Sequence, residues 1–202
     1  MKIRVKSFLV IAAATVLLLG CYPQGAEFYE DLDVVYTNFD DTYDFAGSAG
    51  TYSMPNKIVK IEGNLADGED PEFVKEPYNT AMLARIEDNM EALGWTRVDN
   101  PATADVVLFP ATWTNTTIYY WYDYWCWYYP YYCGWGWGYP SVSSVTTGTL
   151  VMTLVANGPD YIEPTRVWTA AVNGLLSGAY DTDRVNKGID QAFKQSTYLD
   201  TK

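Results

Sequence analysis

The chain has 202 residues, of which 49% are hydrophobic and 16% aromatic, and its formal net charge is −12. This length suits one globular domain, and so many aromatic residues exclude bulk disorder. The chain contains no histidine, which excludes histidine-based catalytic triads and histidine metal ligands. The acidic balance argues against nucleic-acid binding, because phosphate contacts need a basic surface.

The N-terminal residues have the pattern of a secretory signal peptide. A cationic start precedes the apolar run Phe8–Leu19, which is too short to span a bilayer comfortably. The run ends in Leu-Leu-Gly-Cys, which resembles the bacterial lipobox, whose cysteine is lipidated and becomes the new N-terminus. We therefore expect a signal peptide at 1–20, a lipid on Cys21 and a tether at 21–31, with the chain anchored to a membrane without spanning it. Tyr22 is not the aspartate that retains such lipoproteins in the inner membrane of enteric bacteria, so the resemblance implies the outer membrane.

The remaining residues, 32–198, predict one domain that mixes strands and helices. In chain order the pattern predicts strands at 32–39, 51–54 and 57–61, a helix at 77–93, strands at 95–98, 106–119, 142–155 and 167–176, and a helix at 181–198. Since strands and helices do not strictly alternate, we expect an α+β fold, a mostly antiparallel sheet with two helices packed on one face. The apolar stripes of the helices are Met82, Leu83, Ile86, Met90 and Leu93, and Val185, Ile189, Ala192 and Phe193.

A strongly aromatic insertion, residues 119–139, separates the two long strands. Fourteen of its 21 residues are Trp or Tyr. Because aromatic side chains bury about 150–250 Å² each, we expect these rings to cover each other, the domain, a partner or a membrane interface. Alternation interrupted by glycine predicts a hairpin arm that is separable from the fold. The residues we expect to bind a protein, a glycan or another envelope component are Trp121, Trp125, Trp127, Tyr128, Tyr131, Trp135 and Trp137.

Two cysteines, Cys126 and Cys133, lie inside the insertion. In an oxidising envelope we expect them to form a disulfide bond. A metal site would need further soft ligands, and a catalytic cysteine would need a base, so we expect neither a metal nor a cofactor other than the lipid on Cys21.

Several short segments together resemble the uncharacterised bacterial lipoproteins of domain-of-unknown-function family 4136. The resemblance implies an α+β domain on a lipid anchor, at the periplasmic or surface face of the envelope, and implies no reaction. The segments that carry it are Tyr36-Thr37-Asn38-Phe39-Asp40, Phe45, Thr51-Tyr52, Asn89-Met90, Gly94-Trp95-Thr96-Arg97-Val98-Asp99, Ala104-Asp105-Val106-Val107, Gly148-Thr149-Leu150 and Val167-Trp168.

The sequence therefore favours a lipid-anchored, non-enzymatic envelope protein that binds a protein or envelope component through its aromatic arm. Two alternatives remain open. One is a structural lipoprotein that self-associates through the arm. The other is a glycan hydrolase that uses a pair of carboxylates, although no nucleophile elbow, phosphate loop or dinucleotide motif is present.

Overall fold

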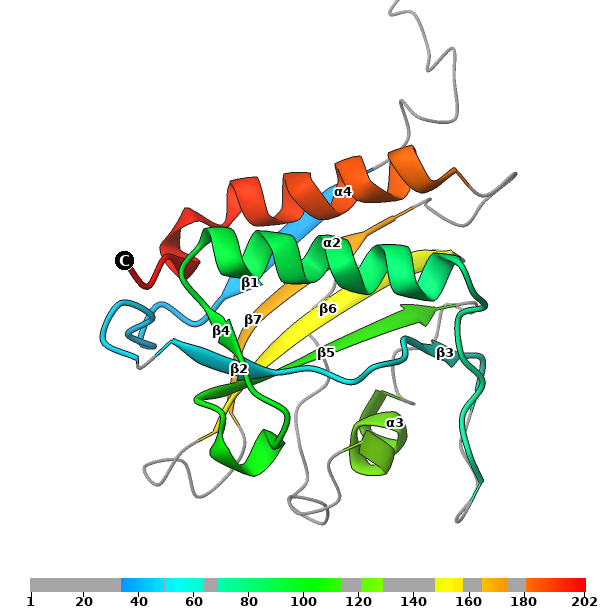
Figure 1. The fold of residues 1–202 in the computed structure, drawn as a ribbon, viewed down its shortest axis with the longest axis horizontal. Helices are drawn as coiled ribbons and strands as arrows, with labels where there is room; N and C mark the ends of the chain where they lie inside the picture. The colour runs from blue at the N-terminus through cyan, green and yellow to red at the C-terminus, as the bar shows by residue number, and fades with distance from the viewer. Residues whose placement is uncertain are drawn as a thin grey trace, which may run out of the picture. The chain divides into compact units, whose positions relative to one another are not determined.

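The computed structural model describes residues 34–48, 50–63, 69–113, 121–128, 148–157, 165–173 and 181–202. Among them, seven strands form one sheet and three α-helices pack against it (Figure 1). The strands are β1 (Val35–Phe39), β2 (Thr51–Ser53), β3 (Val59–Ile61), β4 (Thr96–Arg97), β5 (Val106–Trp113), β6 (Thr149–Ala156) and β7 (Thr165–Val172). The α-helices are α2 (Tyr78–Ala92), α3 (Trp121–Tyr128) and α4 (Thr182–Gln195), and short 3₁₀ helices cover Pro101–Thr103 and Thr197–Leu199.

The sheet is mixed, with an antiparallel half and a parallel half. The strand order is β1-β7-β6-β5-β2-β4, and β3 also pairs with β5. The pairs β1–β7, β7–β6 and β6–β5 are antiparallel, whereas β2 and β3 run parallel to β5, and β2 runs parallel to β4. Parallel neighbours need a crossover connection, and α2 lies in the chain between β3 and β5. The α+β fold is confirmed, and the sheet is mixed rather than purely antiparallel.

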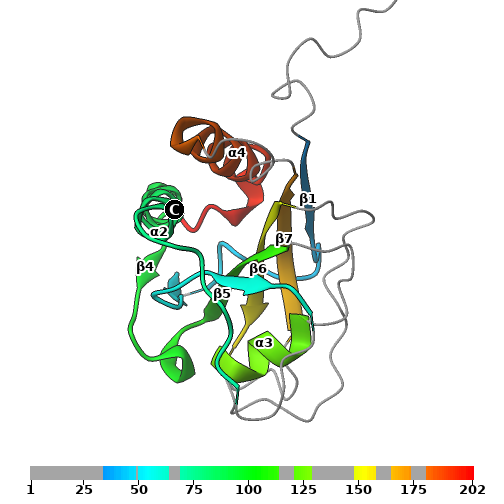
Figure 2. The ribbon, with the colours of Figure 1, turned by 90° about the vertical axis from the view of Figure 1, so that its right-hand side faces the viewer.

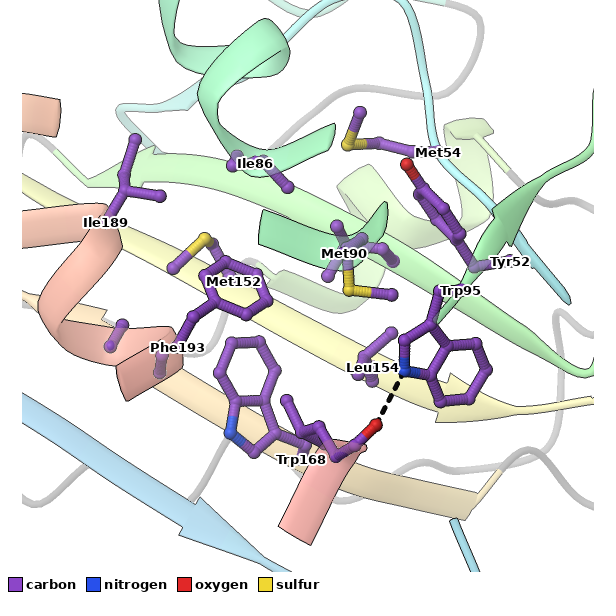
Figure 3. Packing of buried hydrophobic residues seen from close by; sticks show 14 of the residues in the cluster. Tyr52, Met54, Ile86, Met90, Trp95, Met152, Leu154, Trp168, Ile189 and Phe193 are labelled. Atoms are coloured by element: carbon purple, nitrogen blue, oxygen red, sulfur yellow. Dashed lines mark hydrogen bonds between the residues drawn. The ribbon is translucent and has the colours of Figure 1, made fainter. Parts of the chain in front are cut away.

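Helices α2 and α4 cover the same face of the sheet, as expected. The apolar residues Met82, Ile86 and Met90 of α2 are fully buried, and so are Val185 and Ile189 of α4. They pack on sheet side chains such as Met152, Leu154 and Trp168 (Figure 3). The predicted stripes of both helices are therefore the surfaces that face the core.

One ion pair joins these two helices outside the core. The guanidinium group of Arg85 on α2 donates to both carboxylate oxygens of Asp190 on α4. Asn89, one helical turn after Arg85, donates to the same carboxylate. The Arg85 hydrogen bond holds the pKa of Asp190 below its usual range.

The C-terminal residues close the end of α2. Gly94 follows this helix with φ of 94°, a conformation that suits glycine. The backbone N–H of Thr201 donates to the carbonyl oxygen of Leu93 at 3.0 Å. The Trp95 indole N–H donates to the carbonyl oxygen of Leu199 at 2.8 Å, the contact drawn in Figure 3. Residue 201 thus donates a hydrogen bond to a backbone carbonyl that the end of the helix leaves without an intrahelical partner.

Helix α3 packs on the opposite face of the sheet (Figure 2). Alternate residues of a strand point to opposite faces, and Phe109 of β5 points away from α2 and α4. The Trp125 ring, with no exposed surface, meets the Phe109 ring edge-on with centroids 5.8 Å apart. The expectation of a hairpin arm separable from the fold is wrong for 121–128, because these residues form a helix whose Tyr124 and Trp125 belong to the core.

We predict that Trp125→Ala lowers the free energy of unfolding by about 3–5 kcal/mol, because it removes a fully buried ring from the core between α3 and the sheet. Trp127→Ala, two residues further along α3, removes a half-buried ring and should cost less. Chemical denaturation followed by circular dichroism measures both. A Trp125→Ala protein that unfolds at the same denaturant concentration as the parent would show that α3 is dispensable to the core.

Candidate functional site

An open cavity of about 660 Å³ lies beside the C-terminal end of α3. Its walls come from the β2–β3 connection, the segment before α2, the residues from β4 onward and α3 itself. The lining residues are Met54, Pro55, Asn56, Lys57, Asp70, Phe73, Arg97, Asp99, Pro101, Trp127 and Tyr128. Small-molecule sites usually have volumes of roughly 300–1,000 Å³, so this cavity is of a suitable size for a ligand.

Trp127 and Phe73 form an aromatic wall. Their ring centroids are 5.3 Å apart, and the planes are inclined by 55°. The Trp127 indole N–H donates to Asp70 Oδ1 at 3.2 Å, which fixes the orientation of the indole. Both rings are half-buried, so each keeps part of its surface exposed.

Tyr128 fixes the last turn of α3 to the sheet. Its ring stacks on Phe109 with centroids 6.0 Å apart, and its hydroxyl lies 3.3 Å from the Ser53 hydroxyl of β2. Burial raises the pKa of the Tyr128 phenol, so the group stays protonated at neutral pH. Tyr128 therefore supplies a neutral hydroxyl and an aromatic surface to the cavity.

Arg97 of β4 organises another part of the lining through hydrogen bonds to three groups. It donates to Glu87 Oε2 on α2 at 3.1 Å, to the Met54 carbonyl oxygen at 3.1 Å and to Asn56 Oδ1 at 2.7 Å. These contacts join the helix, the edge strand and the β2–β3 connection. Arg97 thus holds the shape of the cavity as well as lining it.

Two further charged residues lie at the rim, and both are exposed. The Lys57 ammonium lies over the Phe73 ring, 4.8 Å from its centroid. Asp99 follows β4 by two residues and lines the same cavity. With Arg97 and Asp70, the lining carries two cationic and two anionic side chains, so its formal charge is balanced.

The structure separates the predicted binding residues into different groups. Trp127 and Tyr128 line the cavity, whereas Trp125 is fully buried and offers no surface to a ligand. Trp121 begins α3. The remaining predicted binding residues, Tyr131, Trp135 and Trp137, lie outside the described residues.

The predicted lipidation site and the predicted disulfide lie wholly or partly outside the described residues. Cys126 lies in α3, while Cys133 lies outside the described residues, so their pairing stays a prediction. Cys21, with the predicted signal peptide and the predicted tether at 1–31, also lies outside them. None of the described helices combines the length and the apolar character that crossing a membrane requires.

Most residues that line the cavity were not predicted from the sequence. Lys57, Asp70, Phe73, Arg97 and Asp99 come from separate segments that only the fold brings together. The sequence marked only two of them, and weakly: Arg97 and Asp99 lie in one of the segments that carry the family resemblance. Among the described residues, no three Cys, Asp or Glu side chains group so as to hold a metal ion, and the expectation that the chain binds no metal stays a prediction.

Comparison with solved structures finds chains similar to this one. The chain is similar to a crystal structure of a DUF4136 family protein from Bacteroides thetaiotaomicron, with 26% identity and a TM-score of 0.62 over 84% of this chain and 98% of that one. It is also similar to a PelC dodecamer from Paraburkholderia phytofirmans, with 12% identity and a TM-score of 0.41 over 84% of this chain and 99% of that one. A search of the curated proteins finds no match.

The family comparison covers most of the sequence. The model of the family described as "Domain of unknown function (DUF4136)" matches residues 35–196. This range begins with β1 and ends just after α4, so it includes the sheet, the three helices and the cavity. The chain therefore belongs to the DUF4136 family.

Proposed function

We propose that the chain is a lipid-anchored, non-enzymatic protein of the bacterial outer membrane that binds an envelope component in the cavity beside α3. The leader ending in Leu-Leu-Gly-Cys21 supports the anchor. The observation that carries the binding role is that residues of α3 face two different surroundings, the core and the cavity. Trp125 fixes the helix to the core, and this places the half-buried rings of Trp127 and Tyr128 at the cavity.

The arrangement favours binding for two reasons. Its aromatic surface is held in place before any ligand arrives, because Asp70 accepts from Trp127 and Ser53 contacts Tyr128. Preorganised groups lose little conformational entropy on binding. In addition, the cavity combines apolar walls with a few polar groups, as ligand sites usually do.

The lipid anchor makes a direct prediction. Cys21→Ser should abolish incorporation of labelled palmitate and block cleavage of the leader, because the modified thiol is absent. Cys126→Ser is the matched control and should keep the label. Labelling of the Cys21→Ser protein, measured by fluorography after immunoprecipitation, would contradict the proposed anchor.

The binding role is tested by cross-linking in native envelopes. A photo-reactive benzoylphenylalanine at position 57, on the cavity rim, should form a discrete adduct with the bound component. Benzoylphenylalanine at position 194, an exposed position on α4, is the control and should form no discrete adduct.

The cavity residues decide the interpretation of that experiment. Adding Trp127→Ala to the position-57 protein should strongly reduce the adduct, because the aromatic wall loses its larger ring. Mass spectrometry of the adduct gives the chemical class of the component. Equal adducts at positions 57 and 194, or an adduct unaffected by Trp127→Ala, would count against the cavity as the binding site.

A further inference from the structure

The charges around the cavity argue against an anionic ligand, and the Lys57 ammonium over the Phe73 ring disfavours a cationic group beside that ring. Lys57 and Arg97 are offset by Asp70 and Asp99 in the same lining. The Arg97 guanidinium already donates to Glu87, Met54 and Asn56, so it is a poor receptor for a phosphate or a carboxylate. The chain as a whole carries a formal charge of −12, which repels anions further.

The same charges argue against a purely apolar ligand. Covering Asp70, Asp99 and Lys57 with a lipid chain would remove water from these groups without replacing its hydrogen bonds, which is costly. A suitable ligand offers hydroxyl groups that both donate and accept. Asp70 retains acceptor capacity for such groups, because a carboxylate has about four lone-pair sites and Trp127 uses one.

The strand pairing disfavours an extended peptide. Peptides often add to a free sheet edge, where the backbone supplies the hydrogen bonds. At the cavity, β2 is already paired with β4 on one side and with β5 on the other, and the edge strand β4 has only two residues, too few for a peptide strand to add to. The recognition surface is therefore made mainly of side chains, with the ring of Trp127 as its largest flat element.

A ligand with one apolar face and a rim of hydroxyl groups satisfies all three conditions, and a pyranose ring has this form. We propose that the cavity takes an uncharged saccharide, stacked on Trp127 and hydrogen-bonded by Asp70 and Asp99. This inference rests on the proposed function and names the ligand class of the same site. The volume of about 660 Å³ suits a short oligosaccharide.

The test is calorimetric titration of the full lipidated chain in an amine-oxide detergent, since sugar-based detergents would compete. Four probes separate the ligand classes: the uncharged tetramers of N-acetylglucosamine and of glucose, anionic tetragalacturonate and the cationic tetramer of glucosamine. At least one uncharged tetramer should bind. Its affinity should change little with added salt, because screening weakens only charge-driven binding.

Variants locate the binding. Trp127→Ala should weaken the uncharged tetramer by about tenfold or more through loss of the stacking surface. Phe39→Ala is the matched control, since it removes a partly exposed aromatic ring that stacks on Tyr198 outside the cavity, and it should leave the affinity unchanged. Circular dichroism confirms that each variant is folded. Equal binding by the Trp127→Ala protein would overturn the assignment to this cavity.

The outcomes distinguish this inference from the proposed function. If no uncharged tetramer binds, or only a charged one does, the saccharide assignment is wrong, while a cavity-dependent adduct at position 57 would still support the binding role. A peptide in that adduct would likewise overturn the saccharide assignment alone. Release of reducing ends from a bound tetramer, lost in Asp99→Asn, would support the ligand class and overturn the non-enzymatic role.

Discussion

The burial of the central strands on both faces is the constraint on which the rest of the structure depends. All residues of β5 and β6 are buried, and so are the last six residues of β7. A sheet of this kind must be covered on both sides, because exposed strands so rich in apolar side chains would associate. Helices α2 and α4 contribute to one cover, and α3 contributes to the other.

The need to cover the second face of the sheet explains why the aromatic insertion takes part in both the fold and the candidate site. Trp125 faces the sheet, so residues further along the same short helix cannot all face it. Trp127 and Tyr128 come at its end, where the β2–β3 connection and the segment before α2 approach. The cavity is therefore formed where the helix leaves the core, between elements that the sheet already holds in place.

Much of the fold could be predicted from local pattern. The stripe of Met82, Ile86 and Met90 predicted a buried helix face, and the patterns at 106–119 and 142–155 predicted the strands β5 and β6. The parallel pairing of β2 with β5 was not predictable in this way, because register between segments separated by a helix depends on tertiary packing. The helical state of 121–128 was missed because Trp and Tyr favour strands locally, and burial against Phe109 outweighs that preference.

The site was predicted only where aromatic density marked it, at Trp127 and Tyr128. Arg97 and Asp70 were missed because the fold alone brings them together.

The contact between the C-terminal residues and α2 bears on the order in which the chain folds. The Thr201 hydroxyl and the Lys202 ammonium group bond to backbone carbonyls of residues 108 and 110 positions earlier, at the end of that helix. Contacts so distant along the chain slow folding, because a large loop must close before they form. They also require residues 201 and 202 to have been synthesised. The end of α2 and the neighbouring strand that carries Arg97 therefore acquire their final packing only after a segment more than one hundred positions later has been synthesised and has reached them.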